Sequence, residues 1–289
     1  MIDDGLTYTE FHSKGMGLIL RLKRCITSFD TKFQRLDLYE TLDFGKLLTL
    51  DNLVMVTEKD EFIYHEMIAH VPLFSHKNPE NVLVIGGGDG GTVREVVKHK
   101  TVKNVDMVEI DEDVVKISKK YLPTMSCELD NPKVNLYFQD GVKWVEDKEN
   151  YYDVIIIDST DPVSIGEGLF TSEFYRNCLK SLKPGGVLAN QTESPFHNPE
   201  WVEATYKKLK KVFPIVKMFT AYVPTYPAGV WSFGFCSKDV DPIENFQEER
   251  YKEYNLKLKY YNNDIHKGAF AVPQFVKELI NKSEVWKNF

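Results

Sequence analysis

The sequence predicts an α/β fold, in which a mostly parallel sheet carries helices on both faces and follows a small N-terminal β domain. Three observations predict it. Beyond residue 79, short apolar runs alternate with helical patterns. A glycine-rich turn follows the first of these runs. Residues 1–57, in contrast, carry only short strand patterns between turn residues. We therefore expect an N-terminal β-strand domain over residues 1–57 and a larger α/β domain over residues 58–289.

The N-terminal segment has the pattern of a small β unit. Residues 18–22 are apolar with an alternating character, and residues 34–40 and 46–50 flank the turn Asp43-Phe44-Gly45 as hairpin strands. Asp51-Asn52 is a further turn signal. Because so small a unit buries little apolar surface, we expect it to pack on its neighbour or on another subunit.

The larger segment alternates strands and helices. The expected strands are residues 82–85, 105–108, 134–138, 154–157 and 186–189. The expected helices are residues 61–70, 92–99, 113–121, 142–146, 172–182 and 199–212, the first of them leading to Pro72. Residues 222–235 are rich in aromatic and β-branched residues, with Pro224-Thr225-Tyr226-Pro227 in their middle.

Composition limits the function classes. The formal charge is −7, with 43% hydrophobic and 27% charged residues, which is ordinary for a globular protein. We expect no nucleic-acid partner, because such proteins present a basic surface. No apolar run reaches membrane-spanning length, and the first residues lack the pattern of a signal peptide. The four cysteines have no paired spacing. A cytoplasmic protein without a metal site is the expectation.

Acidic and amide side chains follow the predicted strands where each strand ends. They are Asp89, Glu109, Asp140, Asp158, Asp161 and Gln191. In an open α/β sheet, ligands bind in the crevice beyond the carboxyl ends of the strands. A crevice lined by these carboxylates is anionic, and we expect its ligand to carry positive charge.

The glycine-rich turn indicates a nucleoside ligand. Gly86, Gly88 and Gly91 match the pattern G-x-G-x-x-G between a strand and a helix, where glycines allow a ligand to approach the backbone closely. The pattern alone fits dinucleotide-binding and methyltransferase-type folds alike, and it also occurs where a helix merely packs tightly on a strand. Glu109, which ends the next strand, is suitably placed to accept hydrogen bonds from two ribose hydroxyls.

Asp89 distinguishes between the nucleoside ligands. It lies inside the turn, where the pyrophosphate of a dinucleotide would have to sit. Two like charges about 4 Å apart cost roughly 4 kcal/mol at an effective dielectric constant near 20. S-adenosylmethionine brings a favourable sulfonium and ammonium but also a carboxylate, whereas its decarboxylated form lacks that carboxylate. The alternative is that Asp89 caps a helix and faces water.

The remaining carboxylates each have a functional and a structural interpretation. Asp140, followed by Gly141, could accept a hydrogen bond from an adenine amino group, or it could serve as a turn or cap. Asp158 and Asp161 flank Ser159-Thr160 after an apolar strand. They could act as a catalytic base and an amine anchor. Alternatively, Asp158 ends a strand and Asp161 caps a turn before Pro162.

Five separated motifs in this order resemble the spermidine synthases, the polyamine aminopropyltransferase family. They are EKDEFIYHEM (58–67), GGGDGG (86–91), VEID (108–111), DSTDP (158–162) and PTYP (224–227). The resemblance runs from about Gln34 to residues 260–266. It implies a methyltransferase-like Rossmann domain, a homodimer or homotetramer, and transfer of an aminopropyl group from decarboxylated S-adenosylmethionine to putrescine, giving spermidine and methylthioadenosine. Decarboxylated S-adenosylmethionine is then a co-substrate, and no further cofactor or metal is expected.

The resemblance also assigns roles to single residues. It implies that Asp158 is the base, Asp89 holds the donor's ammonium, Glu109 binds the ribose, Asp140 and Gly141 contact the adenine, and Gln34 and His65 touch the donor. Tyr64, Asp161, Gln191 and Tyr226 would line the diamine groove. The structural alternatives are core packing for Tyr64 and His65, and a rigid turn with an exposed ring for Tyr226.

The chemistry requires a base, because a protonated amine has no lone pair for attack. We expect burial and the neighbouring Asp161 to raise the pKa of Asp158, and nearby cations to oppose that rise. The loop Val163–Gly168 departs from the pattern of many relatives, which leaves the acceptor open among putrescine, cadaverine, agmatine and spermidine. Alternatives from other classes are an S-adenosylmethionine-dependent methyltransferase and a catalytically silent nucleoside- or polyamine-binding protein.

Overall fold

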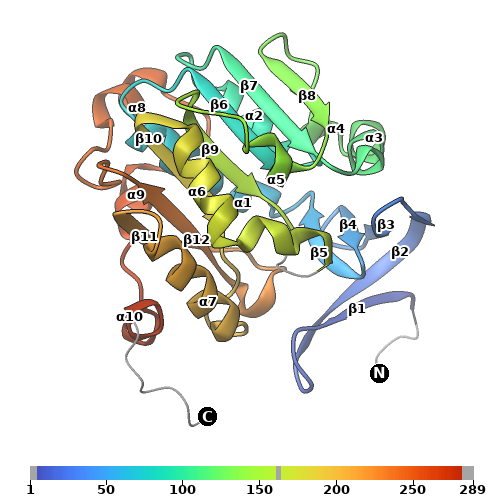
Figure 1. Ribbon diagram of the computed structural model, residues 1–289. Helices are drawn as coiled ribbons and strands as arrows, with labels where there is room; N and C mark the ends of the chain where they lie inside the picture. The colour runs from blue at the N-terminus through green and yellow to red at the C-terminus, as the bar shows by residue number, and fades with distance from the viewer. Residues whose placement is uncertain (1–4, 161–163, 282–289) are drawn as a thin grey trace.

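The computed structural model describes residues 5–160 and 164–281. Its first part is a five-stranded antiparallel sheet in which neighbours in sequence are neighbours in space (Figure 1). The strands are β1 (Thr7–Phe11), β2 (Gly17–Asp30), β3 (Arg35–Thr41), β4 (Lys46–Leu50) and β5 (Leu53–Thr57). The hairpin around Asp43-Phe44-Gly45 joins β3 to β4, as predicted.

Strand β2 is much longer than the predicted segment 18–22. It has 14 residues and pairs with β1 at its first half and with β3 at its second half. Its second half, from Lys23 onward, is mostly exposed or half-buried and carries polar residues. The apolar alternation therefore stops at Leu22, although the backbone ladder with β3 continues.

The second sheet has seven strands in the order β11-β12-β10-β9-β6-β7-β8. They are β6 (Asn81–Gly86), β7 (Asn104–Glu109), β8 (Val134–Phe138), β9 (Tyr152–Asp158), β10 (Leu182–Gln191), β11 (Ile215–Tyr222) and β12 (Val230–Ser237). The five predicted strands, β6 to β10, are parallel to one another. Strand β12 is antiparallel to both β10 and β11. The strand order reverses between β6 and β9, which is where ligands bind in such sheets.

Helices cover both faces of this sheet (Figure 1). They are α1 (Glu61–Ser75), α2 (Gly91–Val97), α3 (Glu112–Tyr121), α4 (Pro123–Ser126), α5 (Gly141–Trp144), α6 (Ser172–Ser181), α7 (Pro199–Lys210), α8 (Glu248–Tyr254), α9 (Asn263–Gly268) and α10 (Gln274–Asn281), with the short 3-10 helices η1 (Ser164–Phe170) and η2 (Pro227–Gly229). Along β6, Val82 and Val84 pack in the core with α1 and α2, whereas Leu83 and Ile85 pack in the core with α6. Two covered faces explain why the predicted strands are continuous apolar runs. The α/β fold class is confirmed.

Helix α1 continues beyond the predicted end at His70. It includes Pro72 and ends at Ser75. Proline usually disfavours helix because it lacks an N–H group. Here the last turn is held by burial, since Leu73 and Phe74 have no exposed surface. Tertiary packing therefore outweighs the local signal of the proline.

The segment 222–235 is not one continuous element. Strand β11 ends at Tyr222, a turn with η2 follows, and β12 begins at Val230. The antiparallel pair β11–β12 and the C-terminal helices α8, α9 and α10 were not predicted. Helices α8 and α9 are short, with seven and six residues, and offer too few turns for an apolar periodicity. Helix α10 has an amphipathic pattern with Phe275, Val276, Leu279 and Ile280 on one face, which was a usable signal that the sequence analysis missed.

The N-terminal sheet packs against the larger sheet's helices. Leu36, Leu38 and Leu48 share a buried cluster with Leu122 and Met125 near α3 and α4. This contact places β4 and β5 beside the carboxyl ends of the parallel strands, as their shared cleft shows. The expectation that the small unit packs on its neighbour is confirmed.

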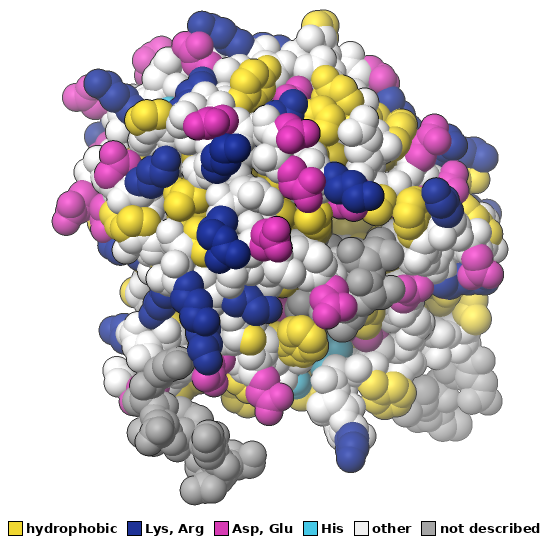
Figure 2. Space-filling model, in the orientation of Figure 1, with side chains coloured by type: hydrophobic (Ala, Val, Ile, Leu, Met, Phe, Trp, Pro, Cys, Tyr) yellow, Lys and Arg dark blue, Asp and Glu magenta, His cyan; other side chains and the backbone are white. Residues whose placement is uncertain are grey.

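The surface carries charges of both signs. On the face shown in Figure 2, Lys and Arg side chains alternate with Asp and Glu side chains. The four cysteines are free thiols, as their spacing predicts, with Cys25 and Cys127 exposed and Cys178 and Cys236 buried. Over residues 5–160 and 164–281, none of the helices is both long and apolar enough to cross a membrane.

Candidate active site

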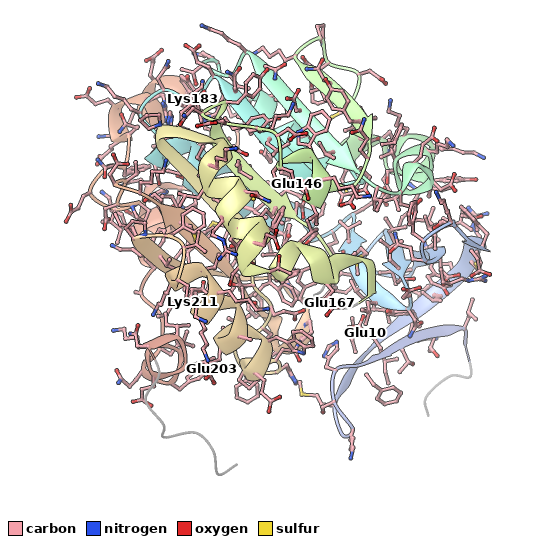
Figure 3. The ribbon with its side chains drawn as sticks, in the orientation of Figure 1. Glu10, Glu146, Glu167, Lys183, Glu203 and Lys211 are labelled. Atoms are coloured by element: carbon pink, nitrogen blue, oxygen red, sulfur yellow. The ribbon has the colours of Figure 1, made fainter. Side chains whose placement is uncertain are left out.

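One cleft gathers the predicted site residues that the structure describes. It lies between the carboxyl ends of the parallel strands and the N-terminal sheet, and extends to Glu10 on β1 (labelled in Figure 3). The predicted residues that line it are Gln34, Tyr64, His65, Asp89, Glu109, Asp140, Gly141, Asp158, Gln191 and Tyr226. Asp161 lies outside the described residues, as does Val163 of the following loop.

Close contact between two strand ends positions Asp158. Gly86 of β6 is the register partner of Asp158 on β9, and the Gly87 N–H donates to the Asp158 carbonyl over 2.8 Å. Gly86 has φ +81°, and a Cβ there would lie 2.1 Å from that carbonyl oxygen. Only glycine fits this turn. A Cβ on Gly87 would lie 3.1 Å from Asp158 Oδ2, so the carboxylate lies directly over the glycine turn.

Two hydroxyls hold the Asp158 carboxylate. The Tyr64 hydroxyl donates to Oδ1 over 2.8 Å, and the Thr92 hydroxyl donates to Oδ2 over 2.6 Å. Burial and the charge of Asp89 raise the pKa of Asp158, while His65 and these two hydroxyls oppose the rise. The direction of the rise and the contribution of burial agree with the prediction, whereas the predicted contribution of Asp161 lies outside the described residues. Asp89 adds to the rise, and the sequence analysis did not pair it with Asp158.

Asp89 meets only part of its structural alternative, and its role toward the donor stays a prediction. Its Oδ1 accepts the Gly91 N–H over 2.6 Å, which is the local turn-capping geometry. The side chain does not face water, because it is only 15% exposed and lies 3.3 Å from His65 Nε2. Burial favours the protonated carboxyl, but His65, the Gly91 N–H and Arg94 outweigh it and lower the pKa of Asp89.

His65 lies between two carboxylates. Its Nδ1 is 2.7 Å from Glu61 Oε2 and its Nε2 is 3.3 Å from Asp89 Oδ1. Burial disfavours the charged imidazole, but Asp89 and Glu61 outweigh it and raise the pKa of His65 well above its usual value. A Cβ on Gly91 would lie 2.3 Å from the imidazole ring, so glycine at this position allows α2 to approach α1.

Glu109 ends β7 beside the glycine turn. Its Oε1 accepts the Asp111 N–H over 2.9 Å, and its Oε2 would lie 3.1 Å from a Cβ on Gly88. Burial raises the pKa of Glu109 to about 7, with the charges of Asp111 and Asp158 adding to that rise. Gln34, from the N-terminal sheet, donates to Asp111 Oδ2 over 3.0 Å.

Asp140 caps a helix and also lines the cleft. Its Oδ1 accepts the Val142 N–H over 2.9 Å at the start of α5. The structural role proposed for Asp140 is therefore present, and its position leaves the ligand role open as well. Gly141 packs against Ile85, since a Cβ there would lie 2.4 Å from that side chain.

Aromatic side chains form the other end of the cleft. The Tyr226 ring centroid lies 5.9 Å from that of Tyr64 and 4.7 Å from that of Trp231, with the rings edge to face. The Tyr226 hydroxyl donates to the Met55 carbonyl over 2.6 Å. The alternative of an exposed Tyr226 ring is wrong, because the side chain is half-buried between these rings. Gln191 donates through Nε2 to the Thr160 carbonyl over 3.2 Å.

The sequence analysis missed several residues of this site. Thr92 holds Asp158, Glu61 holds His65, and Arg94 contacts Glu61. Glu61 and His65 are four residues apart on α1, which places them on one helix face. That spacing was a usable signal for the pair. The contacts of Thr92 and Arg94 depend on how α2 packs against α1 and β9, which spacing alone does not give.

Comparison with known proteins matches this sequence and this fold to one family. The sequence model described as "Spermidine synthase tetramerisation domain" matches residues 6–58, and "Spermine/spermidine synthase domain" matches residues 61–253. The chain belongs to the spermidine synthase family. It is therefore an enzyme of the polyamine aminopropyltransferase type.

Full-length relatives support the assignment. The polyamine aminopropyltransferase of Alkaliphilus metalliredigens is 52% identical over 97% of this chain and 99% of the relative. That of Alkaliphilus oremlandii is 51% identical over 96% of this chain and 99% of the relative. A crystal structure of a spermidine synthase in complex with the transition-state analogue AdoDATO superposes with a TM-score of 0.94. It is 44% identical and covers 96% of each chain.

Proposed function

We propose that this spermidine synthase family member transfers the aminopropyl group of decarboxylated S-adenosylmethionine to putrescine, which gives spermidine and methylthioadenosine. The observation that carries the proposal is the pair Asp89 and Asp158. Both line one cleft, but the pKa of Asp89 is lowered and that of Asp158 is raised. Carboxylates with opposite shifts suit opposite roles, here a cation anchor and a proton acceptor.

The donor would lie along the carboxyl ends of β6, β7 and β8. In this arrangement Asp89 binds its ammonium, Glu109 binds the ribose hydroxyls, and Asp140 and Gly141 contact the adenine. Gln34 and His65 complete the donor side. The carboxylate of ordinary S-adenosylmethionine would lie near Asp89, where like charges about 4 Å apart cost roughly 4 kcal/mol. That repulsion favours the decarboxylated donor.

The acceptor would occupy the aromatic end of the cleft. Tyr64, Gln191, Tyr226 and Asp161 are the proposed lining of the diamine groove. The attacking amine must first lose a proton, which Asp158 accepts or guides away. The nitrogen then forms a bond to the donor's aminopropyl carbon as the carbon–sulfur bond breaks. The sulfonium takes that electron pair and leaves as a neutral thioether, so the proposed reaction needs no metal or further cofactor.

The assembly and location are part of the proposal. A homodimer or homotetramer is supported by the match of residues 6–58 to a tetramerisation domain. The four cysteines are free thiols, as expected in a reducing compartment, which supports a cytoplasmic location.

A product assay tests the proposed function. The purified enzyme is incubated with decarboxylated S-adenosylmethionine and, separately, putrescine, cadaverine, agmatine and spermidine, and products are identified by mass. We expect spermidine and methylthioadenosine, with putrescine giving the highest kcat/KM. Faster turnover of another amine would identify that amine, instead of putrescine, as the preferred acceptor. Methyl transfer from S-adenosylmethionine, or no methylthioadenosine with any amine, would contradict the proposal.

A further inference from the structure

The imidazole of His65 has a carboxylate oxygen at each ring nitrogen. Glu61 Oε2 is 2.7 Å from Nδ1, and Asp89 Oδ1 is 3.3 Å from Nε2. A neutral imidazole has one N–H and one lone pair, so one of these nitrogens would point a lone pair at a carboxylate. Only the imidazolium donates to both. The His65 side chain is 3% exposed, so water does not replace either contact.

Arg94 holds Glu61, the carboxylate on the Nδ1 side of His65. Its Nη1 donates to Glu61 Oε1 over 3.0 Å and its Nη2 donates to Glu61 Oε2 over 2.8 Å, a bidentate pair. The same guanidinium donates to Glu95 and to the Thr124 carbonyl. Glu61 is therefore ionised and oriented toward His65. Burial raises the pKa of Glu61, but His65 and Arg94 outweigh it and lower that pKa.

The charges that meet around His65 come from several elements. They are Glu61 from α1, Asp89 from the glycine turn, Arg94 from α2 and Asp158 from β9, with the neutral Tyr64 of α1 beside them. Without a cation among them, the buried carboxylates Asp89 and Asp158 would compete for one proton. His65 contacts only one of the two, since its Nε2 faces Asp89.

We propose that Arg94, Glu61 and His65 act as a charge relay that keeps Asp89 ionised, so that Asp158 is the carboxylate of the pair that accepts a proton. Glu61 and Arg94 are positioning residues, because they act through His65. The inference deepens the proposed function and rests on it for the roles of the two carboxylates. The opposite pKa shifts of Asp89 and Asp158 agree with the relay.

The charge of His65 can be measured without any substrate. In the wild-type enzyme with ¹⁵N-labelled histidine, we expect both ring nitrogens of His65 to show imidazolium shifts at pH 8, with the signal assigned by its loss in His65→Gln. In Glu61→Gln, the imidazolium should lose its proton at a lower pH than in the wild type, because one of its two carboxylate partners is gone. A neutral His65 in the wild type at pH 8 would overturn the relay, whatever the activity of the enzyme.

The effect on Asp158 is measured by the pH profile of kcat/KM for the donor. Glu61→Gln removes one of the two carboxylates that hold the positive charge on His65, so the imidazolium is weakened and opposes the rise in the pKa of Asp158 less. We expect the acidic limb to move to higher pH by about one unit. His65→Gln should shift it similarly, and the double variant should shift it no further than His65→Gln alone.

Glu66→Gln is the matched control. Glu66 is a buried carboxylate on the same helix, but it accepts the N–H groups of Lys259, Tyr260 and Tyr261. In the pH profile of the Glu66→Gln enzyme, the acidic limb of kcat/KM should stay at the wild-type pH. An unshifted limb in Glu61→Gln, or additive shifts in the double variant, would overturn the relay even where spermidine is formed normally. If Glu61→Gln does not fold, His65→Gln alone carries the test, because it removes the cation and leaves Glu61 paired with Arg94.

Discussion

At the residue scale, Asp89 and Asp158 show how surroundings give one residue type two roles. Asp89 has the His65 cation and a backbone N–H, whereas Asp158 has two neutral hydroxyls. The pKa of Asp89 is lowered and that of Asp158 is raised. The two roles therefore depend on the hydrogen-bond partners of each carboxylate rather than on the number of carboxylates in the cleft.

Asp158→Asn should remove the proton acceptor and preserve the shape of the site. We expect kcat to fall by about 10²–10⁴-fold, because general-base contributions are of that order. Donor binding, measured by calorimetry, and the far-UV circular dichroism spectrum should stay close to those of the wild type. Turnover at the wild-type rate would remove Asp158 from the mechanism.

Thr92→Val should make the Asp158 carboxyl a weaker acid. The change deletes the hydroxyl that donates to Oδ2 over 2.6 Å, so the charged carboxylate loses a hydrogen bond. The pKa of Asp158 should rise further, and activity should be lost at a higher pH than in the wild type as the pH falls. Thr205→Val, a buried threonine on α7, is the control for the lost hydroxyl. Identical pH profiles for both variants would contradict this role of Thr92.

Much of the candidate site was predictable at this scale. The residues at strand ends could be predicted because parallel strands end at one edge of the sheet. Tyr64, His65 and Tyr226 came only from the family resemblance, and their roles remain predictions. Thr92 and Arg94 could not be predicted, because their contacts with Asp158 and Glu61 arise where α2 packs against other elements.

At the element scale, the β6–α2 turn is the part of the fold that most constrains the site. Gly86→Ala would place a Cβ 2.1 Å from the Asp158 carbonyl at φ +81°, whereas Gly185→Ala, at φ +74°, would meet no atom within 4 Å. Both should lose about 1–2 kcal/mol of unfolding free energy to the positive φ. Gly86→Ala should lose roughly 1–3 kcal/mol more through the clash.

Urea denaturation followed by circular dichroism measures the difference between the two alanine variants. Gly86→Ala should also lose turnover, because the clash displaces the end of β9. Equal unfolding free energies would show that the β6–β9 contact accommodates the added methyl group without loss of stability. Glycine would then not be required at position 86.

Elements with strong apolar patterns were predicted well, and elements held by tertiary contacts were not. Strands β6, β7 and β9 are buried on both faces, and the apolar runs Val82–Ile85 and Val154–Ile157 reflect it, whereas the edge strand β8 is only half-buried or exposed. The last turn of α1 forms in spite of Pro72, because Leu73 and Phe74 are fully buried. Helices α8 to α10 are short and partly buried, and their positions depend on contacts with distant elements.

At the scale of the whole molecule, two large apolar side chains of the N-terminal sheet are exposed to solvent. Thr9 pairs with Ile19 and Phe11 pairs with Gly17, so Phe11 and Ile19 lie on the same face of the hairpin. Phe11 is 75% exposed and Ile19 is 66% exposed. The opposite face carries the buried Tyr8 and Leu20. Exposed apolar side chains of this kind are typical of contacts between subunits.

Phe11→Glu combined with Ile19→Lys should weaken that assembly. Light scattering after size-exclusion chromatography should give a dimer or tetramer mass for the wild type, as multiples of 33.5 kDa, and a smaller mass for the variant. The double variant Phe138→Glu and Tyr151→Lys alters exposed aromatics elsewhere and is the control. A wild-type monomer, or an unchanged mass in the first variant, would contradict the assignment of this face.

The central claim is that the cleft selects a cation and rejects an additional anion near Asp89. Isothermal titration calorimetry of the wild-type enzyme with decarboxylated S-adenosylmethionine and with S-adenosylmethionine tests it most directly. We predict a lower Kd for the decarboxylated compound and a much smaller difference in Asp89→Asn, where the repulsion of the carboxylate is gone. Equal affinity for the two compounds, or tighter binding of the carboxylated one by the wild type, would contradict the claim.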